Sequence, residues 1–222
     1  MTIYIEGDGY AWRTREWPSE DPTPIEPVAA RLAVAHPFGA AAWLGRLCQY
    51  ADAERTGCPV ESWTTHRFSK GSHEVLSSGI DEIKRITGAR SLILVGFSGG
   101  GAIAANLAAA RQDVLALITV AGNIDLDAWA KAHGFPAFKD RVNPAEQGDR
   151  LRVLPQIHFA GYRDSVIPLN ISESFLKRIA PVRGRLVIKD EAHQCCWPMK
   201  WPTYLRELGD ELPWGDAMSR KE

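Results

Sequence analysis

One stretch near the middle of the chain constrains the fold more than any other: segment 91–110, which reads SLILVGFSGGGAIAANLAAA. Its apolar start, 92–95, has the length and aliphatic character of a strand buried on both faces. Its alanine-rich end, 102–110, has high helix propensity and no Gly or Pro to interrupt it. A buried strand that runs directly into a helix is typical of an α/β fold.

The turn between this strand and this helix, residues 96–100, reads GFSGG and fits the pattern G-x-S-x-G. If the strand reverses sharply into the helix, the residues two before and two after the serine meet closely, and only very small side chains fit. Ser98 would then lie at the apex in a strained backbone conformation, with its hydroxyl exposed and the helix N-terminus behind it. The pattern therefore predicts a nucleophilic serine.

The same stretch has two other interpretations. The motif by itself is weakly specific, because roughly one chain of this length in ten contains it by chance, and Ser98 would then be only a turn residue. Alternatively, Gly99, Gly101 and Ala104 fit G-x-G-x-x-A after a strand, which is a dinucleotide-binding fingerprint whose ribose-binding acid would be Asp125. The rest of the chain decides between these interpretations.

Aliphatic segments of strand length alternate with helical segments along the chain. The predicted strands are 3–5, 40–47, 92–95, 114–120, 157–160 and 185–189. The predicted helices are 27–36, 72–87 (with Ser72 as its N-cap), 102–110, 168–179 and 197–208. This alternation predicts an α/β fold with a mostly parallel sheet of about six strands and helices on both faces.

The segment 123–155 interrupts this alternation. It carries helix-like pieces around Trp129 but no strong strand. We expect it to be a small lid-like insertion over the C-terminal edge of the sheet, within a single domain that covers 1–222. A chain of 222 residues is at the upper end of one compact domain.

Three polar residues follow three different predicted strands. Ser98 follows 92–95, Asp164 follows 157–160, and His193 follows 185–189. Because chemistry gathers at the carboxyl ends of parallel strands, all three fall on one edge of the sheet. The dinucleotide interpretation explains neither Asp164 nor His193.

On these motifs the sequence resembles the α/β-hydrolase family over most of its length. The resemblance rests on the turn at 96–100, the pattern G-x-x-D-x-x-I-P at 161–168, and the histidine past the last strand, in the family's order Ser, Asp, His. The chain departs from the family in lacking the usual first two strands. Its E-G-D-G turn at 6–9 and its C-Q-Y segment at 48–50 resemble an uncharacterised bacterial branch, which supplies no substrate.

The resemblance implies a catalytic role for each of the three residues. Ser98 would be the nucleophile, His193 the general base and then acid, and Asp164 the carboxylate that orients the imidazole. Each has a plainer alternative. Asp164 would otherwise cap the helix that begins near Pro168, leaving Asp125 as the reserve acid, and His193 would be an ordinary loop histidine.

The resemblance also implies backbone donors for a tetrahedral oxyanion. One is the N–H of Gly99, and the other is an N–H of the loop after the first strand, at Asp8 or Gly9. Many relatives have a histidine before the glycine of that loop, whereas this chain has carboxylates at Glu6 and Asp8. These would oppose catalysis unless turned away or paired, and the candidate partners are nearby arginines: Arg13 and Arg15.

Several aromatic residues fall in segments near the predicted edge and are candidates to line an acyl pocket: Tyr10, Trp12, Trp129, Tyr162 and Trp197. Each of them has packing as an alternative explanation.

The four cysteines are Cys48, Cys58, Cys195 and Cys196. They form no C-x-x-C pair, and adjacent cysteines suit one tetrahedral zinc poorly, so we expect no metal site. A Cys48–Cys58 disulfide would close a loop after a strand and imply a periplasmic or secreted protein; otherwise the protein is cytoplasmic. A bridge between the vicinal pair is the less expected arrangement, and four unpaired thiols are the plain alternative.

Charge and hydropathy limit the partners. A formal net charge of −1 gives no case for nucleic acid, and no apolar run reaches the roughly 18 residues of a membrane span. The N-terminus has no signal-peptide pattern and starts abruptly at a strand, which suggests a trimmed or mature chain. Nothing indicates an oligomeric state.

These observations together predict a serine hydrolase that needs no cofactor and acts on carboxylic esters or thioesters of small-molecule acyl groups. The alternatives are an amide or peptide hydrolase with the same three residues, and a non-catalytic ligand-binding protein on the same fold.

Overall fold

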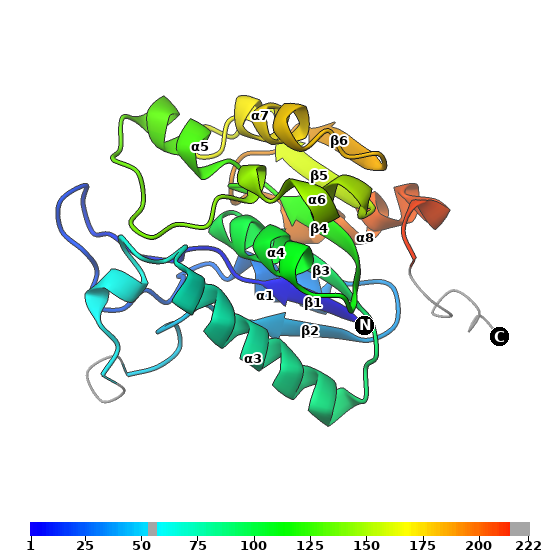
Figure 1. Cartoon of the computed structure of the whole chain (residues 1–222), viewed down its shortest axis with the longest axis horizontal. Coiled ribbons are helices and arrows are strands. Elements are labelled where there is room, and N and C mark those ends of the chain that lie inside the picture. The colour runs from blue at the N-terminus through cyan, green and yellow to red at the C-terminus, as the bar shows by residue number, and fades with distance from the viewer. Residues whose placement is uncertain (53–56, 214–222) are drawn as a thin grey trace.

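The centre of the molecule is a six-stranded sheet, seen in a computed structural model that describes residues 1–52 and 57–213 (Figure 1). All neighbouring strands are parallel and their order is β2-β1-β3-β4-β5-β6. The predicted α/β fold with about six parallel strands is confirmed. The strands are β1 (Thr2–Ile5), β2 (Ala41–Leu44), β3 (Leu92–Phe97), β4 (Val114–Val120), β5 (Gln156–Gly161) and β6 (Gly184–Lys189).

Successive side chains of the central strands enter two different apolar layers. In β3, Leu92 and Leu94 join the cluster that contains Ile80 and Ile103, whereas Ile93 joins the cluster on the opposite face. Side chains alternate along a strand, so a strand covered on both faces can be apolar at every position. This is why the sequence shows continuous aliphatic runs rather than alternation.

Helices cover both faces of the sheet (Figure 1). On one face lie α3 (Lys70–Thr87), α4 (Gly99–Ala110), α6 (Gly148–Val153) and α7 (Leu169–Ile179), and on the other α1 (Val28–Val34) and α8 (Trp197–Glu207). Helix α3 begins before the predicted start because Ser69, not Ser72, is its N-cap; the Ser69 side chain accepts a hydrogen bond from the Ser72 N–H.

The segment 123–155 forms α5 (Leu126–His133), a 3-10 turn η2 (Pro144–Glu146) and α6. Leu151 of α6 is fully buried in the main cluster, so α6 is part of the helix layer over the sheet. Helix α5 instead lies beside the C-terminal edge, where Trp129 reaches the candidate site described below. Two further 3-10 turns are η1 (Val60–Ser62) and η3 (Gly209–Glu211).

Two disulfides are present. Cys48 is bonded to Cys58, one of the two arrangements that the sequence left open for these cysteines, with Cα atoms 5.9 Å apart. Cys195 is bonded to Cys196, the pairing that the sequence made less expected. Among the helices in the described part of the chain, none combines the length and the apolar character required to cross a membrane.

Candidate active site

Ser98 lies at the apex of a sharp turn between β3 and α4. Its backbone has φ 52° and ψ −124°, a conformation that non-glycine residues rarely adopt. A Cβ on Gly96 would collide with the carbonyl of Gly100, and a Cβ on Gly100 would collide with the carbonyl oxygen of Ile5. The steric reason predicted for the small residues at 96 and 100 is therefore present, and the turn holds Ser98 above the start of α4.

An unbroken chain of hydrogen bonds joins Ser98, His193 and Asp164. His193 Nε2 lies 3.0 Å from Ser98 Oγ, and His193 Nδ1 lies 2.8 Å from Asp164 Oδ2. An ionised carboxylate can only accept, so Nδ1 carries the imidazole proton and Nε2 is left to accept from the serine hydroxyl. This arrangement can remove a proton from Ser98 as the oxygen attacks an electrophile.

Asp164 uses its two carboxylate oxygens for different purposes. Oδ2 bonds the imidazole, while Oδ1 accepts the N–H groups of Val166 and Ile167, each at 2.8 Å. The carboxylate is fully buried, so these bonds fix its orientation. The alternative role as a helix cap does not apply, because Pro168 is the N-cap of α7 and has no side-chain cap bond.

Asp125, the reserve acid, is committed elsewhere. Its carboxylate accepts from Ser174 Oγ at 2.7 Å, from Arg178 Nη1 at 3.2 Å and from the N–H of Ala128, where it caps α5. None of the hydrogen bonds that it makes within the described residues goes to His193. Asp125 is also buried, so its carboxylate is not accessible to bind the ribose of a dinucleotide.

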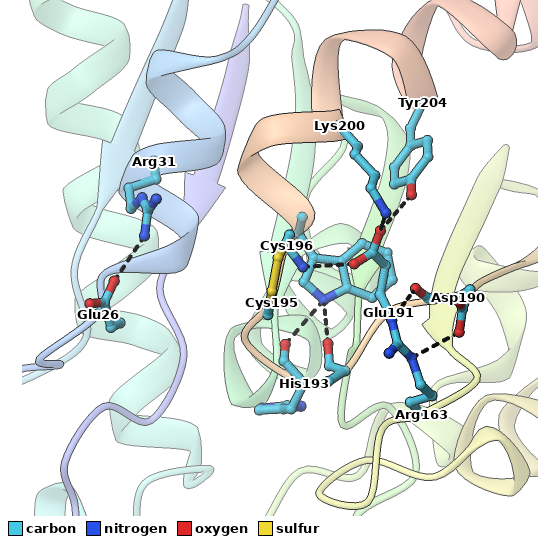
Figure 2. The surroundings of a disulfide bond; sticks show 12 residues. Glu26, Arg31, Arg163, Asp190, Glu191, His193, Cys195, Cys196, Lys200 and Tyr204 are labelled. Atoms are coloured by element: carbon cyan, nitrogen blue, oxygen red, sulfur yellow. Dashed lines mark hydrogen bonds and ion pairs between the residues drawn. A yellow bond between two sulfur atoms is a disulfide. The ribbon is translucent and has the colours of Figure 1, made fainter.

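The loop after β6 fixes the position of His193 (Figure 2). The indole N–H of Trp197 donates to the carbonyls of Ala192 and His193, at 3.0 and 3.1 Å. Trp197, the first residue of α8, is itself fully buried in the core. The prediction that Trp197 lines an acyl pocket is therefore wrong: its ring packs inside the protein and positions the loop.

A buried carboxylate in the same loop, Glu191, ties it to α8 (Figure 2). It accepts hydrogen bonds from Lys200 Nζ, Tyr204 OH and the N–H of Cys196, at 2.6, 2.7 and 2.7 Å. Burial alone would favour the neutral acid, but these donors outweigh it and hold the pKa of Glu191 below its usual value. The loop that carries His193 is thus held by charge-assisted bonds at its base.

The loops after β5 and β6 approach each other closely. The N–H of Arg163 donates to the carbonyl of Glu191 at 3.0 Å, and a Cβ on Gly161 would collide with that carbonyl. Glycine at 161 therefore allows the two strand ends to meet. This contact brings Asp164, on one loop, within hydrogen-bond distance of His193 on the other.

The loop after β1 lies against the Ser98 turn. A Cβ on Gly7 would be 3.3 Å from the Cβ of Ser98. The backbone N–H groups of Asp8, Gly9 and Gly99 donate to no acceptor in the part of the chain that the structure describes. Unpaired N–H groups beside a nucleophile are the donors that an oxyanion requires.

Both carboxylates of this loop are held by donors. Glu6 accepts from the N–H groups of Ala29 and Ala30, at the first turn of α1, and from the indole N–H of Trp43 at 3.1 Å. A carboxylate at a helix N-terminus is favoured by the helix dipole. Glu6 is therefore turned away from Ser98 and caps α1.

Asp8 is bound by two buried arginines. Arg46 Nη1 lies 3.0 Å from Oδ1, and Arg67 Nε lies 2.9 Å from Oδ2. The predicted partners were wrong, because Arg13 pairs with Glu20 and Arg15 lies over the ring of Phe135: the proline-rich segment carries both away from the loop. The two guanidinium groups therefore hold the Asp8 carboxylate in place beside the unpaired N–H groups.

A cavity of about 420 Å³ opens in front of Ser98 and His193. Of the aromatic residues proposed to line it, Tyr10 and Trp129 do so. Two others do not: Tyr162 is 73% exposed on the surface, and Trp12 packs against the small cluster around Cys48. The remaining apolar wall is formed by Pro24, Ile25, Phe97, Val166 and Ile167.

Four residues of the site region were missed by the sequence analysis. Arg46, Glu191 and Asn123 each follow a strand closely, so their position at the C-terminal edge was a usable signal. Arg67 lies in an irregular segment and gave none. Among the described residues, no group of three or more His, Cys, Asp or Glu side chains is arranged to hold a metal.

Comparison with family models matches residues 40–195, well over half of the chain, to the family described as serine hydrolase (FSH1). None of the curated proteins matches the sequence.

Among solved structures, the chain is similar to an esterase domain of a Rhodothermus marinus protein. The TM-score is 0.60 at 13% identity, with 94% of this chain and 84% of that chain covered. It is similar to the Pyrococcus furiosus esterase Pf2001, with a TM-score of 0.53 and 17% identity over 67% of this chain. The match covers 64% of that esterase, so the chain spans a little under two thirds of its length. A third similar structure, the Pyrococcus horikoshii acylaminoacyl peptidase, has a TM-score of 0.51 at 17% identity, with 66% of this chain and 28% of that chain covered. Identities this low show a shared fold.

Proposed function

The chain belongs to the FSH1 family of serine hydrolases and shares the α/β-hydrolase fold. From that premise we propose that it is a hydrolase that cleaves carboxylic esters or thioesters through an acyl-enzyme on Ser98. The observation that carries this proposal is the hydrogen-bond chain from Ser98 Oγ through His193 to Asp164. It lies at the wall of a cavity large enough for a small or medium acyl group.

In the first half of the reaction, Ser98 Oγ attacks the carbonyl carbon while its proton passes to His193 Nε2. The negative oxygen of the tetrahedral intermediate accepts from the N–H of Gly99 and from an N–H of Asp8 or Gly9. Asp164 stabilises the imidazolium that forms. Collapse breaks the bond to the leaving oxygen or sulfur, which takes the proton from His193.

In the second half, water replaces the departed alcohol or thiol. His193 Nε2 accepts a proton from the water, whose oxygen attacks the acyl-enzyme carbonyl. The second tetrahedral intermediate uses the same N–H donors. Its collapse returns the proton to Ser98 Oγ and releases the carboxylic acid.

The test is covalent labelling with a fluorophosphonate, which reacts with activated serines. We expect labelling at Ser98, with loss of both labelling and p-nitrophenyl ester hydrolysis in Ser98→Ala. Absence of label on the folded wild-type protein would contradict the proposal and favour a ligand-binding role. Rates on a matched ester, thioester and anilide of one acyl acid then separate ester, thioester and amide hydrolysis.

A further inference from the structure

Asn123 is a buried residue of the candidate site that the reaction above does not use. It follows β4, is 2% exposed, and lines the same cavity as Ser98 and His193. Its backbone N–H donates to the carbonyl of Ser98 at 2.9 Å, so its position relative to the nucleophile is fixed.

The carboxamide of Asn123 has no hydrogen-bond partner. Its Oδ1 is buried and unpaired, and its Nδ2 donates to nothing among the described residues. A buried polar group without a partner is destabilising, so such groups in native proteins need an explanation. A substrate group that arrives in the cavity would supply the missing partner.

Two other buried asparagines show that this is particular to Asn123. The carboxamide of Asn143 bonds Asp125 and the N–H groups of Leu126 and Ala145, as a structural asparagine does. Asn106 on α4 donates to two acceptors outside the cavity, although its Oδ1 is unpaired. Of these buried asparagines, only Asn123 has both amide atoms unpaired at the cavity.

The surroundings of the reacting carbon indicate which part of the substrate meets Asn123. The oxyanion points to the N–H groups of the loop after β1, and the leaving group points to His193, which protonates it. In the sheet, β1 and β4 flank β3 on opposite sides. We infer that the remaining substituent, the acyl chain, lies opposite the oxyanion donors, on the side of β3 where Asn123 lines the cavity.

The other charges at the cavity are already paired. Glu6 is held by helix α1, Asp8 by two arginines, and Glu26 by Arg31 at 2.8 Å (Figure 2). The rest of the wall is largely apolar. Among the buried side chains of the wall, the carboxamide of Asn123 thus offers an acyl chain an uncharged donor and an uncharged acceptor, the pair that a hydroxyl group satisfies.

We propose that Asn123 is a specificity-determining residue, a proposal that rests on the proposed esterase function. The preferred substrates are esters or thioesters of carboxylic acids with a hydroxyl group on the second or third carbon. The carboxamide donates to and accepts from that hydroxyl. A site built to hydrogen-bond a substrate hydroxyl discriminates against the analogue that lacks it, because its own polar group is then left unpaired.

The test compares kcat/KM for p-nitrophenyl esters of butyric, 2-hydroxybutyric and 3-hydroxybutyric acid. We expect the wild-type protein to prefer one hydroxy ester over butyrate by tenfold or more, after correction for their uncatalysed hydrolysis rates. Asn123→Leu, which keeps the number and branching of the side-chain heavy atoms and removes both polar atoms, should abolish that ratio. Asn106→Leu is the matched control: it also removes a buried asparagine and should keep the ratio.

Two contrary outcomes are distinguishable. Fluorophosphonate labelling and butyrate hydrolysis without any hydroxy preference would overturn the role of Asn123 and leave the esterase proposal intact. Absence of labelling and of all ester hydrolysis would overturn both. If Asn123→Leu does not fold, the ratio of kcat/KM for the hydroxy ester to that for butyrate is measured in Asn123→Ser instead. The wild-type ratio is also a test without any variant, because a wild-type preference for butyrate contradicts the proposal.

Discussion

At the scale of single residues, the site depends on carboxylates that are divided between structural and chemical tasks. Asp164 gives one oxygen to two backbone N–H groups and the other to His193. Glu6 caps α1, and Glu191 holds the loop of His193. Each of these carboxylates accepts hydrogen bonds from donors of a different segment, which fixes its orientation.

Asp164→Asn should lower kcat on p-nitrophenyl butyrate by on the order of 10⁴, by analogy with serine proteases. An amide N–H facing Nδ1 favours the tautomer with its proton on Nε2, which cannot accept from Ser98. Asp125→Asn is the matched control and should stay within about tenfold of wild type, because its bonds go to α5 and α7. Near-normal turnover in folded Asp164→Asn would contradict the assigned role.

At the scale of elements, five strand ends supply the site, and each loop is held by side chains from another element. The loop after β1 is the clearest case, because Asp8 is bound by Arg46, just after β2, and by Arg67, just before α3. Both arginines are almost fully buried and also lie over the ring of Phe68. The N–H groups of this loop are thereby held beside Ser98.

Arg46→Met should destabilise the protein by about 2–4 kcal/mol, because it removes one partner of a largely buried ion pair whose Asp8 is partly solvated. It should also lower kcat roughly tenfold or more, since the N–H donors lose part of their support. Urea unfolding and ester hydrolysis measure the two effects. Arg85→Met is the control: it breaks an exposed ion pair with Glu82 on α3 and should change neither the free energy of unfolding nor kcat by much. Equal effects of Arg46→Met and Arg85→Met would contradict the supporting role of Arg46.

At the scale of the whole molecule, buried histidines in the core link stability to pH. Burial lowers the pKa of His158, in β5, to about 3. Burial also lowers the pKa of His73, on α3, to about 4, despite a hydrogen bond to the Ser69 carbonyl. His158 bonds Thr119 and Gln156 as a neutral ring, inside the sheet. Between pH 4 and 6.5 these two histidines are therefore neutral in the folded protein but bind protons in the unfolded chain.

Stability should fall as the pH drops from about 6.5, the pKa of an unfolded histidine, toward 4, because the unfolded state then binds more protons than the folded state. The slope is about 1.4 kcal/mol per pH unit for each such histidine. Carboxylates with lowered pKa, such as Asp113 at about 2, reduce stability only below about pH 4. In urea unfolding between pH 7 and 4.5, His158→Gln should have the shallower slope; identical slopes would contradict the assignment.

The sequence by itself determined the sheet and the three residues on its edge. Aliphatic runs identify buried parallel strands, and such strands share one carboxyl edge, so Ser98, Asp164 and His193 could be placed together without coordinates. The glycines at 96 and 100 could also be explained locally, because they relieve contacts around the turn that holds the serine. These features depend on residues close in sequence or on a topological rule.

Only the tertiary structure decided what holds and surrounds that edge. The partners of Asp8 are Arg46 and Arg67, distant in sequence, whereas the nearby Arg13 and Arg15 were wrong. Likewise, Trp197 is core rather than pocket, and the unpaired carboxamide of Asn123 is visible only once every neighbour is in place. Ion pairs and unpaired hydrogen-bonding groups arise from packing between segments far apart along the chain. Such contacts have no signature in the local amino-acid sequence.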